Sequence, residues 1–268
     1  MLRSVFGKNL FERRRSVLAW CVGLASMVVV MVAFFPTIKA RGAEFDRLLA
    51  DYPPALLAIV GWDAGSTISS PAGYLQGELF SMMIPILLMV AAIGAGATTI
   101  AGEEERGTLE LLVAHPVSRV RIALEKVAAV VVADLLLGLV LATTLIAAGP
   151  AFDLHLGAAQ IGAASLLASL VAAFFSVLAL AVGAGTGRRG LAVGVTAGVG
   201  AAAYLLNSLT PLVAALRPWR RLSPFFYYAA SEPLRHGFHW PHVVVLVAAT
   251  AAAAVVAVRL FERRDLAV

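Results

Sequence analysis

The sequence predicts an all-α membrane protein with six transmembrane helices. Of its 268 residues, 60% are hydrophobic and 14% are charged, and the mean hydropathy is +0.89. Soluble domains, by comparison, carry about 25% charged residues. Apolar runs recur along the chain, and a run of about 20 residues is long enough to cross the hydrocarbon core as a helix. Arginine and lysine residues flank these runs, as is typical of membrane-spanning segments.

The first 15 residues predict an amphipathic helix at the membrane surface. Apolar residues recur with helical spacing among basic ones, which suits a helix lying on an anionic leaflet. The apolar set is Leu2, Val5, Phe6 and Leu10, and the basic set is Arg3, Lys8, Arg13, Arg14 and Arg15. Residues 17–36 follow as the first span. Their uncharged run is longer than the roughly 7–15 residues of a signal peptide's apolar region, so we expect it to remain in the protein.

The remaining elements follow from the alternation of polar and apolar stretches. Residues 37–78 are polar, contain five acids and three bases, and are expected on the outer side of the membrane. Pro85 lies in the second span and predicts a kink there. The five further spans are expected over residues 79–101, 123–148, 158–187, 191–216 and 239–258, so residues 1–268 form one transmembrane domain.

The distribution of basic residues predicts the orientation of the chain. Six spans place both termini on one side, and the segments on that side hold 14 of the 21 lysines and arginines. The positive-inside rule therefore places both termini in the cytoplasm. We expect a multi-pass protein of a prokaryotic cytoplasmic membrane, in which basic side chains contact lipid headgroups rather than nucleic acid.

Residues 102–121, here called the charged hairpin, are the most densely charged segment and connect the second and third spans on the cytoplasmic side. The positive-inside rule explains their arginines but not the three consecutive glutamates, Glu103, Glu104 and Glu105. These carboxylates are expected to meet a basic partner. Ser118 is expected to cap a basic helix that continues into the third span.

A short helix is predicted inside the charged hairpin. It begins at Gly107 and Thr108, includes Leu109 and Glu110, and ends before Pro116. An isolated helix of about seven residues is marginal in water, so it needs a surface on which to dock. Its apolar face is formed by Leu109, Leu112 and Val113.

Two other groups of residues are candidates for chemistry. Asp134 is the one acid deep in a predicted span, and an ionisable residue at such a depth is often functional. We expect its carboxyl group to be hydrogen-bonded at a subunit interface or to reach lipid headgroups, and a proton relay is the alternative. His236, His239 and His242 are weak metal candidates, because Pro241 prevents one helix from carrying all three. We expect no metal there and an aromatic belt instead.

Two further motifs predict no chemistry. The glycine-rich stretch 183–190 lacks the Lys-Ser/Thr ending of a phosphate-binding loop and is interpreted as close packing followed by a turn. The single cysteine, Cys21, cannot form an internal disulfide and is expected to be a packed apolar residue.

At the charged hairpin the sequence resembles the ABC-2 type permeases of ATP-binding cassette exporters. The pattern Glu-x-Glu-x-Gly-Thr-Leu-Glu-Leu-Leu-x-x-x-Pro-Val-Ser-Arg occupies residues 103–119, and residues 222–228 and 261–266 support the resemblance. It implies six spans, an amphipathic N-terminal helix and a coupling helix between spans two and three. It also implies two permease chains, each docked on a separately encoded ATPase that holds ATP and magnesium. The implied coupling residues are Glu103, Glu104, Glu105, Gly107, Thr108, Leu109, Glu110, Leu112 and Pro116.

The resemblance predicts a non-catalytic permease subunit that binds no cofactor itself. Its partners would be two copies of an ABC ATPase, a second copy of itself or a paralogous permease, and membrane lipids. The expected substrate is hydrophobic or amphiphilic: a drug, an antibiotic or a lipid. The alternatives are an ABC-coupled subunit for signalling or maturation without bulk transport, and a proton-coupled carrier that uses Asp134. A membrane enzyme would need a nucleophile with its base, or paired acids, within the membrane.

Overall fold

The computed structural model describes residues 5–53, 56, 67–109 and 117–264, and this part of the chain contains helices and no strand. Six helical segments in it are long and apolar enough to cross a membrane. They are α1 (Val5–Ala40), Pro71–Thr99, α8 (Arg119–Ala148) continued by the 3-10 helix η2 (Gly149–Phe152), α9 (Ala158–Thr186), α10 (Arg189–Leu209) and α13 (Trp240–Arg263). The prediction of six apolar spans is therefore confirmed.

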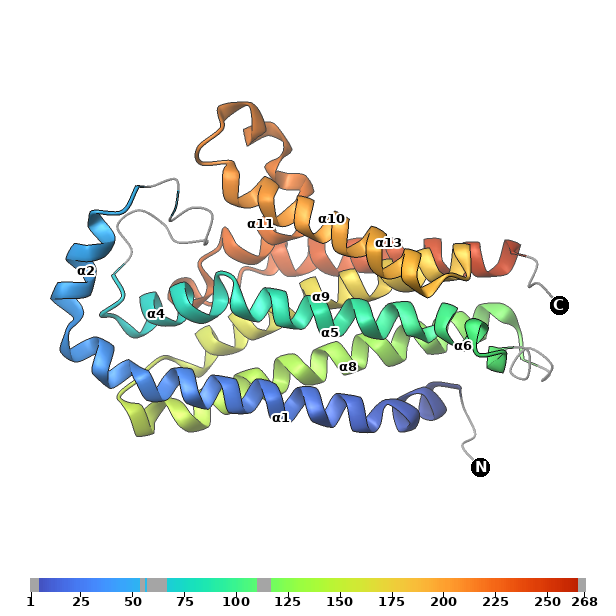
Figure 1. Cartoon of the computed structure of the whole chain (residues 1–268), viewed down its shortest axis with the longest axis horizontal. Helices are drawn as coiled ribbons and strands as arrows, with labels where there is room; N and C mark the ends of the chain where they lie inside the picture. Colours follow the sequence, from blue (N-terminus) through green and yellow to red (C-terminus); the bar gives the residue numbers. More distant parts are fainter. Residues whose placement is uncertain (1–4, 54–55, 57–66, 110–116, 265–268) are drawn as a thin grey trace.

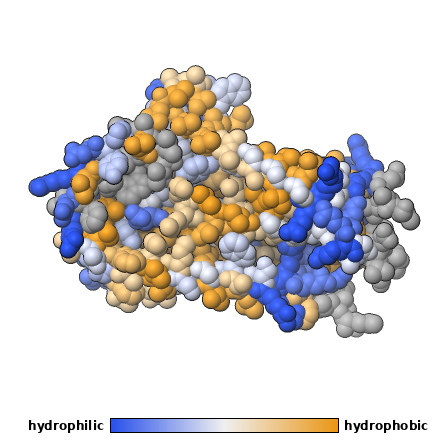
Figure 2. Space-filling view, in the orientation of Figure 1, coloured by the Kyte–Doolittle hydropathy of each residue, from blue (hydrophilic) through white to orange (hydrophobic). Residues whose placement is uncertain are grey.

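The spans form an elongated bundle in which α9 is central (Figure 1). The apolar part of α9 is 78% buried, whereas the corresponding parts of α1, α10 and α13 are each 17% buried. Small residues make this central position possible: Gly96 packs so closely on α9 that a Cβ atom there would lie 1.9 Å from the Ser176 carbonyl oxygen. On the face shown in Figure 2, apolar residues cover much of the middle and hydrophilic residues gather toward the two ends.

The start of the chain differs from the prediction. Residues 5–15 are not a separate surface helix but the first three turns of α1, which runs without a break to Ala40 and contains Pro36. No glycine or proline interrupts residues 8–22, so nothing in the backbone stops the helix there. The polar residues of these turns also find partners on the bundle, as described below.

The second span is built from three pieces. These are α4 (Pro71–Tyr74), the π-helix η1 (Leu75–Phe80) and α5 (Met83–Thr99), after which the short helix α6 (Ala101–Glu105) begins the charged hairpin. Pro85 lies in the first turn of α5, where its missing N–H costs no helical hydrogen bond. The second span is instead interrupted before this proline, at Ser81 and Met82.

The fifth span ends earlier than predicted, at Leu209 instead of residue 216. Pro211 follows two residues later and cannot donate the hydrogen bond that would continue the helix. The chain then forms the 3-10 helix η3 (Ala214–Leu222) and the short helices α11 (Pro224–Ala229) and α12 (Pro233–His236). The sixth span extends beyond the predicted residue 258, to Arg263.

At the end of the bundle opposite α6, two tyrosine hydroxyl groups bind separate elements together. Tyr74 donates a hydrogen bond to the Met31 carbonyl at 2.6 Å, and Tyr228 donates one to the Phe80 carbonyl. Burial raises the pKa of the Tyr228 phenol further above neutral pH. In the predicted outer segment, α2 (Gly42–Ala50) contributes Asp46, which accepts hydrogen bonds from the Ile68 amide and the Ser69 hydroxyl, each at 2.8 Å.

Candidate functional site

The charged hairpin begins at the end of the bundle that also holds the first turn of α1 and the last turn of α13 (Figure 1). We call this the α6 end. The chain leaves the second span through α6 and enters α8 with Ser118 as its cap, whose hydroxyl accepts a hydrogen bond from the Arg121 amide. The predicted cap at Ser118 is therefore confirmed.

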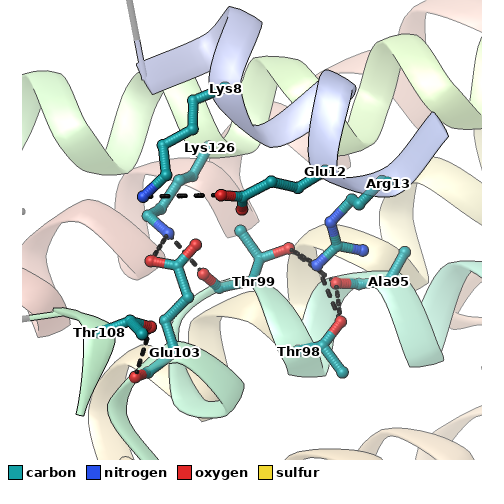
Figure 3. A network of polar contacts seen from close by, with 9 residues as sticks. All are labelled: Lys8, Glu12, Arg13, Ala95, Thr98, Thr99, Glu103, Thr108 and Lys126. Atoms are coloured by element: carbon teal, nitrogen blue, oxygen red, sulfur yellow. Dashed lines mark hydrogen bonds and ion pairs between the residues drawn. The ribbon is translucent and has the colours of Figure 1, made fainter. Parts of the chain in front are cut away.

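Glu103 is paired with Lys126 inside the protein (Figure 3). The Lys126 ammonium lies 2.6 Å from the Glu103 carboxylate, and the exposed fractions of the two residues are 0% and 7%. The ammonium also donates to the Thr99 carbonyl at 2.6 Å. Thr99 is the last residue of α5, where carbonyl groups lack a helical partner. Lys126 thus fills the break between α5 and α6 and joins both to α8.

The first turns of α1 cover this pair. The Arg13 guanidinium donates to the hydroxyl oxygens of Thr98 and Thr99, at 2.8 and 2.7 Å. Both hydroxyl groups in turn donate to carbonyls one turn earlier in α5, which leaves their lone pairs free for Arg13. The Phe6 amide donates to the Glu125 carboxylate of α8 at 3.0 Å. The N-terminal residues of α1 are thus bound to the second and third spans.

Glu104 and Glu105 bind two other parts of the chain. Glu104 accepts hydrogen bonds from Arg264, which follows α13, and one of these is 3.0 Å long. Glu105 accepts a hydrogen bond from the Arg189 backbone amide at 2.8 Å. Arg189 is the first residue of α10, so the carboxylate lies where a helix favours negative charge.

The three glutamates expected to meet a basic partner therefore each contact a different part of their own chain. Glu103 contacts α8, Glu104 contacts the residue after α13, and Glu105 contacts α10. These contacts fix the base of the charged hairpin relative to the third, fifth and sixth spans. Successive residues of a helix point about 100° apart, so three consecutive glutamates can reach partners on three elements.

The residues after α6 form a tight turn. Gly107 has a φ of +68°, a conformation that suits glycine, and the Thr108 hydroxyl donates to the Glu103 carbonyl at 3.1 Å. Leu109 is 1% exposed and belongs to an apolar cluster with Ile100 and Ile122. Its side chain is thus covered by the protein itself. The coupling residues Glu110, Leu112 and Pro116, and the predicted helix beyond Leu109, lie outside the described residues.

Asp134 occupies a different place from the one predicted. It is 2% exposed, on a face of α8 that is buried in the single chain, so it lies neither at a subunit interface nor within reach of headgroups. One carboxyl oxygen, Oδ2, has no hydrogen-bond partner among the described residues. Apolar residues occupy nearly every position around Asp134, so the sequence does not reveal which face of α8 packs inside the protein.

The three histidines lie at the opposite end of the bundle. The rings of His239 and His242 are 4.2 Å apart, and Tyr227 packs edge-on against His242. His236 ends α12 and is exposed. In the described ranges no group of three histidine, cysteine or acidic side chains is arranged to hold a metal ion.

The sequence did not reveal the residues that bind the three glutamates, which are Lys126, Arg189 and Arg264. All three enter the positive-inside count, but their hydrogen-bond partners Thr99, Glu105 and Glu104 lie 27, 84 and 160 residues away in the sequence. For Lys126 a signal does exist: it is followed directly by the apolar run of the third span, where a lysine needs a partner. For Arg264 the signal is its place in the tail motif at residues 261–266.

One protein-family model matches nearly the whole chain. The family described as ABC-2 family transporter protein matches residues 3–266, which include all six spans, the charged hairpin and Arg264. A comparison with curated proteins gives no significant match. Permeases of this family are non-catalytic membrane subunits that pair with ABC ATPase subunits. The chain is therefore a multi-pass membrane protein that belongs to the ABC-2 family of ABC transporter membrane subunits.

Proposed function

We propose that the chain is the permease subunit of an ABC exporter, driven by ATP hydrolysis on a separate subunit. The observation that carries this proposal is the construction of the α6 end. A connection between the second and third spans is held by Glu103, Glu104 and Glu105 against the third, sixth and fifth spans. A force applied to such a connection reaches the membrane part instead of being lost in a loose loop.

The α6 end is proposed to face the cytoplasm, with both termini on that side. The segments at this end hold twice as many basic residues as those at the other end, which supports this orientation by the positive-inside rule. A prokaryotic cytoplasmic membrane is the proposed location. ATP and magnesium would bind to the ATPase, two copies of which would serve two permease chains.

The charged hairpin is the proposed coupling element. Its base is held by the three glutamates, Gly107 provides the turn, and Leu109 anchors the next residues in the apolar cluster. Glu110, Leu112 and Pro116 are proposed to contact the ATPase. Closure of the two ATPase subunits would then push on α6 and change the route between the permeases.

Replacement of residues 110–115 by a glycine-serine linker of equal length tests this role. We expect the variant to insert and remain folded, because the described contacts on both sides of the replaced residues are kept. When the unchanged protein is co-expressed with the ABC ATPases of its genome, we expect its own ATPase to co-purify with it. We expect the linker variant to lose this co-purification. The control is Arg15→Gln, which removes an exposed charge at the same end. Undiminished ATPase binding by the linker variant would contradict the assignment.

Pairing of two copies is proposed through α10. A Cβ atom added at Gly190, Gly194 or Gly198 would meet no atom within 4 Å, so these glycines lie on an uncovered face of a helix that is only 17% buried. In lipid, small residues at spacing four allow helices to approach closely. An uncovered face of this composition suits a second copy better than it suits lipid.

Cross-linking tests this pairing in a Cys21→Ser background, which leaves the introduced cysteine as the single thiol. We expect Gly194→Cys to form a disulfide-linked dimer in membranes under mild oxidation. The control is Leu139→Cys, which places a thiol on the exposed face of α8. Equal cross-linking at both positions would indicate random collision and would contradict an α10 interface.

The substrate is proposed to be hydrophobic or amphiphilic. The exposed faces of the spans carry valine and leucine, and the acid deep in the third span, Asp134, is enclosed. A route between two such chains would therefore present an apolar wall. Stimulation of ATP turnover by amphiphiles in a reconstituted complex tests this. Its consistent absence across such compounds would favour the signalling or maturation role.

A further inference from the structure

The last turn of α13 and the residue that follows it contact the charged hairpin in two ways. Phe261 is 1% exposed and belongs to the same apolar cluster as Leu109. Arg264 binds Glu104 of α6. These two residues lie in the tail motif 261–266, for which the proposed coupling through the second and third spans has no role.

Arg264 is held by three other elements at once. Its guanidinium donates to Glu104 at 3.0 Å and to the Ala184 carbonyl of α9 at 3.3 Å. Its own carbonyl accepts a hydrogen bond from the Arg119 side chain of α8 at 2.7 Å. A cation at the C-terminal end of α9 is also favoured by the helix dipole. Arg264 is thus the point where α6, α8, α9 and α13 meet.

Gly187 makes room for this guanidinium. It ends α9 with a φ of +67°, and a Cβ atom at this position would lie 2.7 Å from the Arg264 Cζ atom. The left-handed backbone conformation favours glycine at this position, and any side chain there would displace the Arg264 guanidinium from its present place. The contact is built from the glycine-rich stretch and the tail motif together, which explains why both occur in this sequence.

Through this contact α13 becomes linked to an element far from it in sequence. α6 and Arg264 are 160 residues apart, whereas α5 and α8 are joined to the charged hairpin by the chain itself. α13 runs from Arg264 to the opposite end of the bundle along α9 and α8, and only 17% of its apolar part is buried (Figure 1). A displacement of α6 would be passed to α13 by the charge-assisted hydrogen bonds between Glu104 and Arg264.

We propose that Arg264 is a positioning residue that ties the sixth span to the charged hairpin. Movement of α6 is thereby delivered to α13 as well as to α5 and α8. This inference rests on the proposed function for the source of the movement, but the contact that it concerns is a separate one.

The test uses the complex with its ATPase in lipid nanodiscs and single cysteines in a Cys21→Ser background. An environment-sensitive fluorophore is placed either at Val244 of α13 or at Met83 of α5, both of which are exposed near the end opposite α6. We expect ATP to change the emission at both positions in the otherwise unchanged protein. In Arg264→Gln and Glu104→Gln we expect loss of the response at Val244 with the response at Met83 retained.

Two further variants separate a specific contact from a general effect. Arg263→Gln removes the neighbouring exposed charge and should keep both responses. The double exchange Glu104→Arg with Arg264→Glu should restore part of the response at Val244, because the pair is re-formed with opposite polarity. An undiminished response at Val244 in Arg264→Gln would overturn the inference. Equal loss at both positions, or an unresponsive Val244 in the unchanged complex, would do so as well.

A second measurement needs no ATPase and therefore distinguishes failure of this inference from failure of the proposed function. The free energy of unfolding in detergent is compared for Glu104→Gln, Arg264→Gln and the double variant. Non-additive effects are expected for a working pair. Additive effects would show that the two side chains are not coupled and would overturn the inference even if no ATPase binds the chain.

Discussion

Lys126→Met is expected to lower the free energy of unfolding by about 3–5 kcal/mol, the cost of removing one partner of a buried ion pair. Lys126 is fully buried and is bound to the Glu103 carboxylate and the Thr99 carbonyl. Methionine has a similar volume, so the loss arises from the carboxylate that is left without a counter-charge. Unfolding by SDS titration of the protein in mixed micelles measures the change.

The double variant Glu103→Leu with Lys126→Met is the informative companion. An apolar pair of similar volume is often as stable as the ion pair that it replaces, so we expect most of the lost stability to return. A charge-removing control at the same end is Lys8→Met, whose partner Glu12 is exposed, and this change should cost less than about 1 kcal/mol. If Lys126→Met costs no more than Lys8→Met, the pair has no role in holding α6.

If the double variant folds but no longer couples ATP turnover to the permease, the pair serves position rather than stability. An ion pair accepts only a narrow range of geometries, because the ammonium must meet both Glu103 and the end of α5. Two apolar side chains would hold α6 less specifically. The buried charges would then be retained for the rigid base that they give the charged hairpin.

Gly96→Val is expected to prevent the normal packing of the bundle. A Cβ atom at Gly96 would lie 1.9 Å from the Ser176 carbonyl oxygen, and this atom belongs to the backbone of the central helix α9. No side chain can move aside, so the two helices must separate along their contact. We expect a cost of about 3 kcal/mol or more, at the upper end for overpacked interiors. The yield of monodisperse protein and the SDS midpoint report it.

Gly94→Val provides a control within the same helix. A Cβ atom at Gly94 would meet no atom within 4 Å, so its substitution should change stability by less than about 0.5 kcal/mol. The two glycines are two residues apart in the same helix. Equal effects of the two substitutions would contradict the close contact between α5 and α9 on which the central position of α9 depends.

The sequence by itself determined the six spans, because a helix must present an apolar surface over the whole hydrocarbon thickness and this requirement is visible in composition. It also determined the start of the third span at Ser118, because an N-cap depends on neighbouring residues alone. The ends of some helices could not be predicted from the sequence in the same way. Pro211 ends the fifth span early. α1 is continuous because its first turns contain no helix breaker, although their basic residues suggested a separate surface helix.

Only the tertiary structure decided where the charges go. The three glutamates look alike in the sequence, yet they bind Lys126, Arg264 and Arg189 on three different elements. It also decided that Asp134 and Leu109 are enclosed by the chain itself. The physical reason is that a spanning helix is selected by its own residues, whereas an ion pair is selected by whichever side chains the folded bundle brings together. In this protein the spans can be predicted locally, and the contacts that hold the charged hairpin arise only from the packing of the whole bundle.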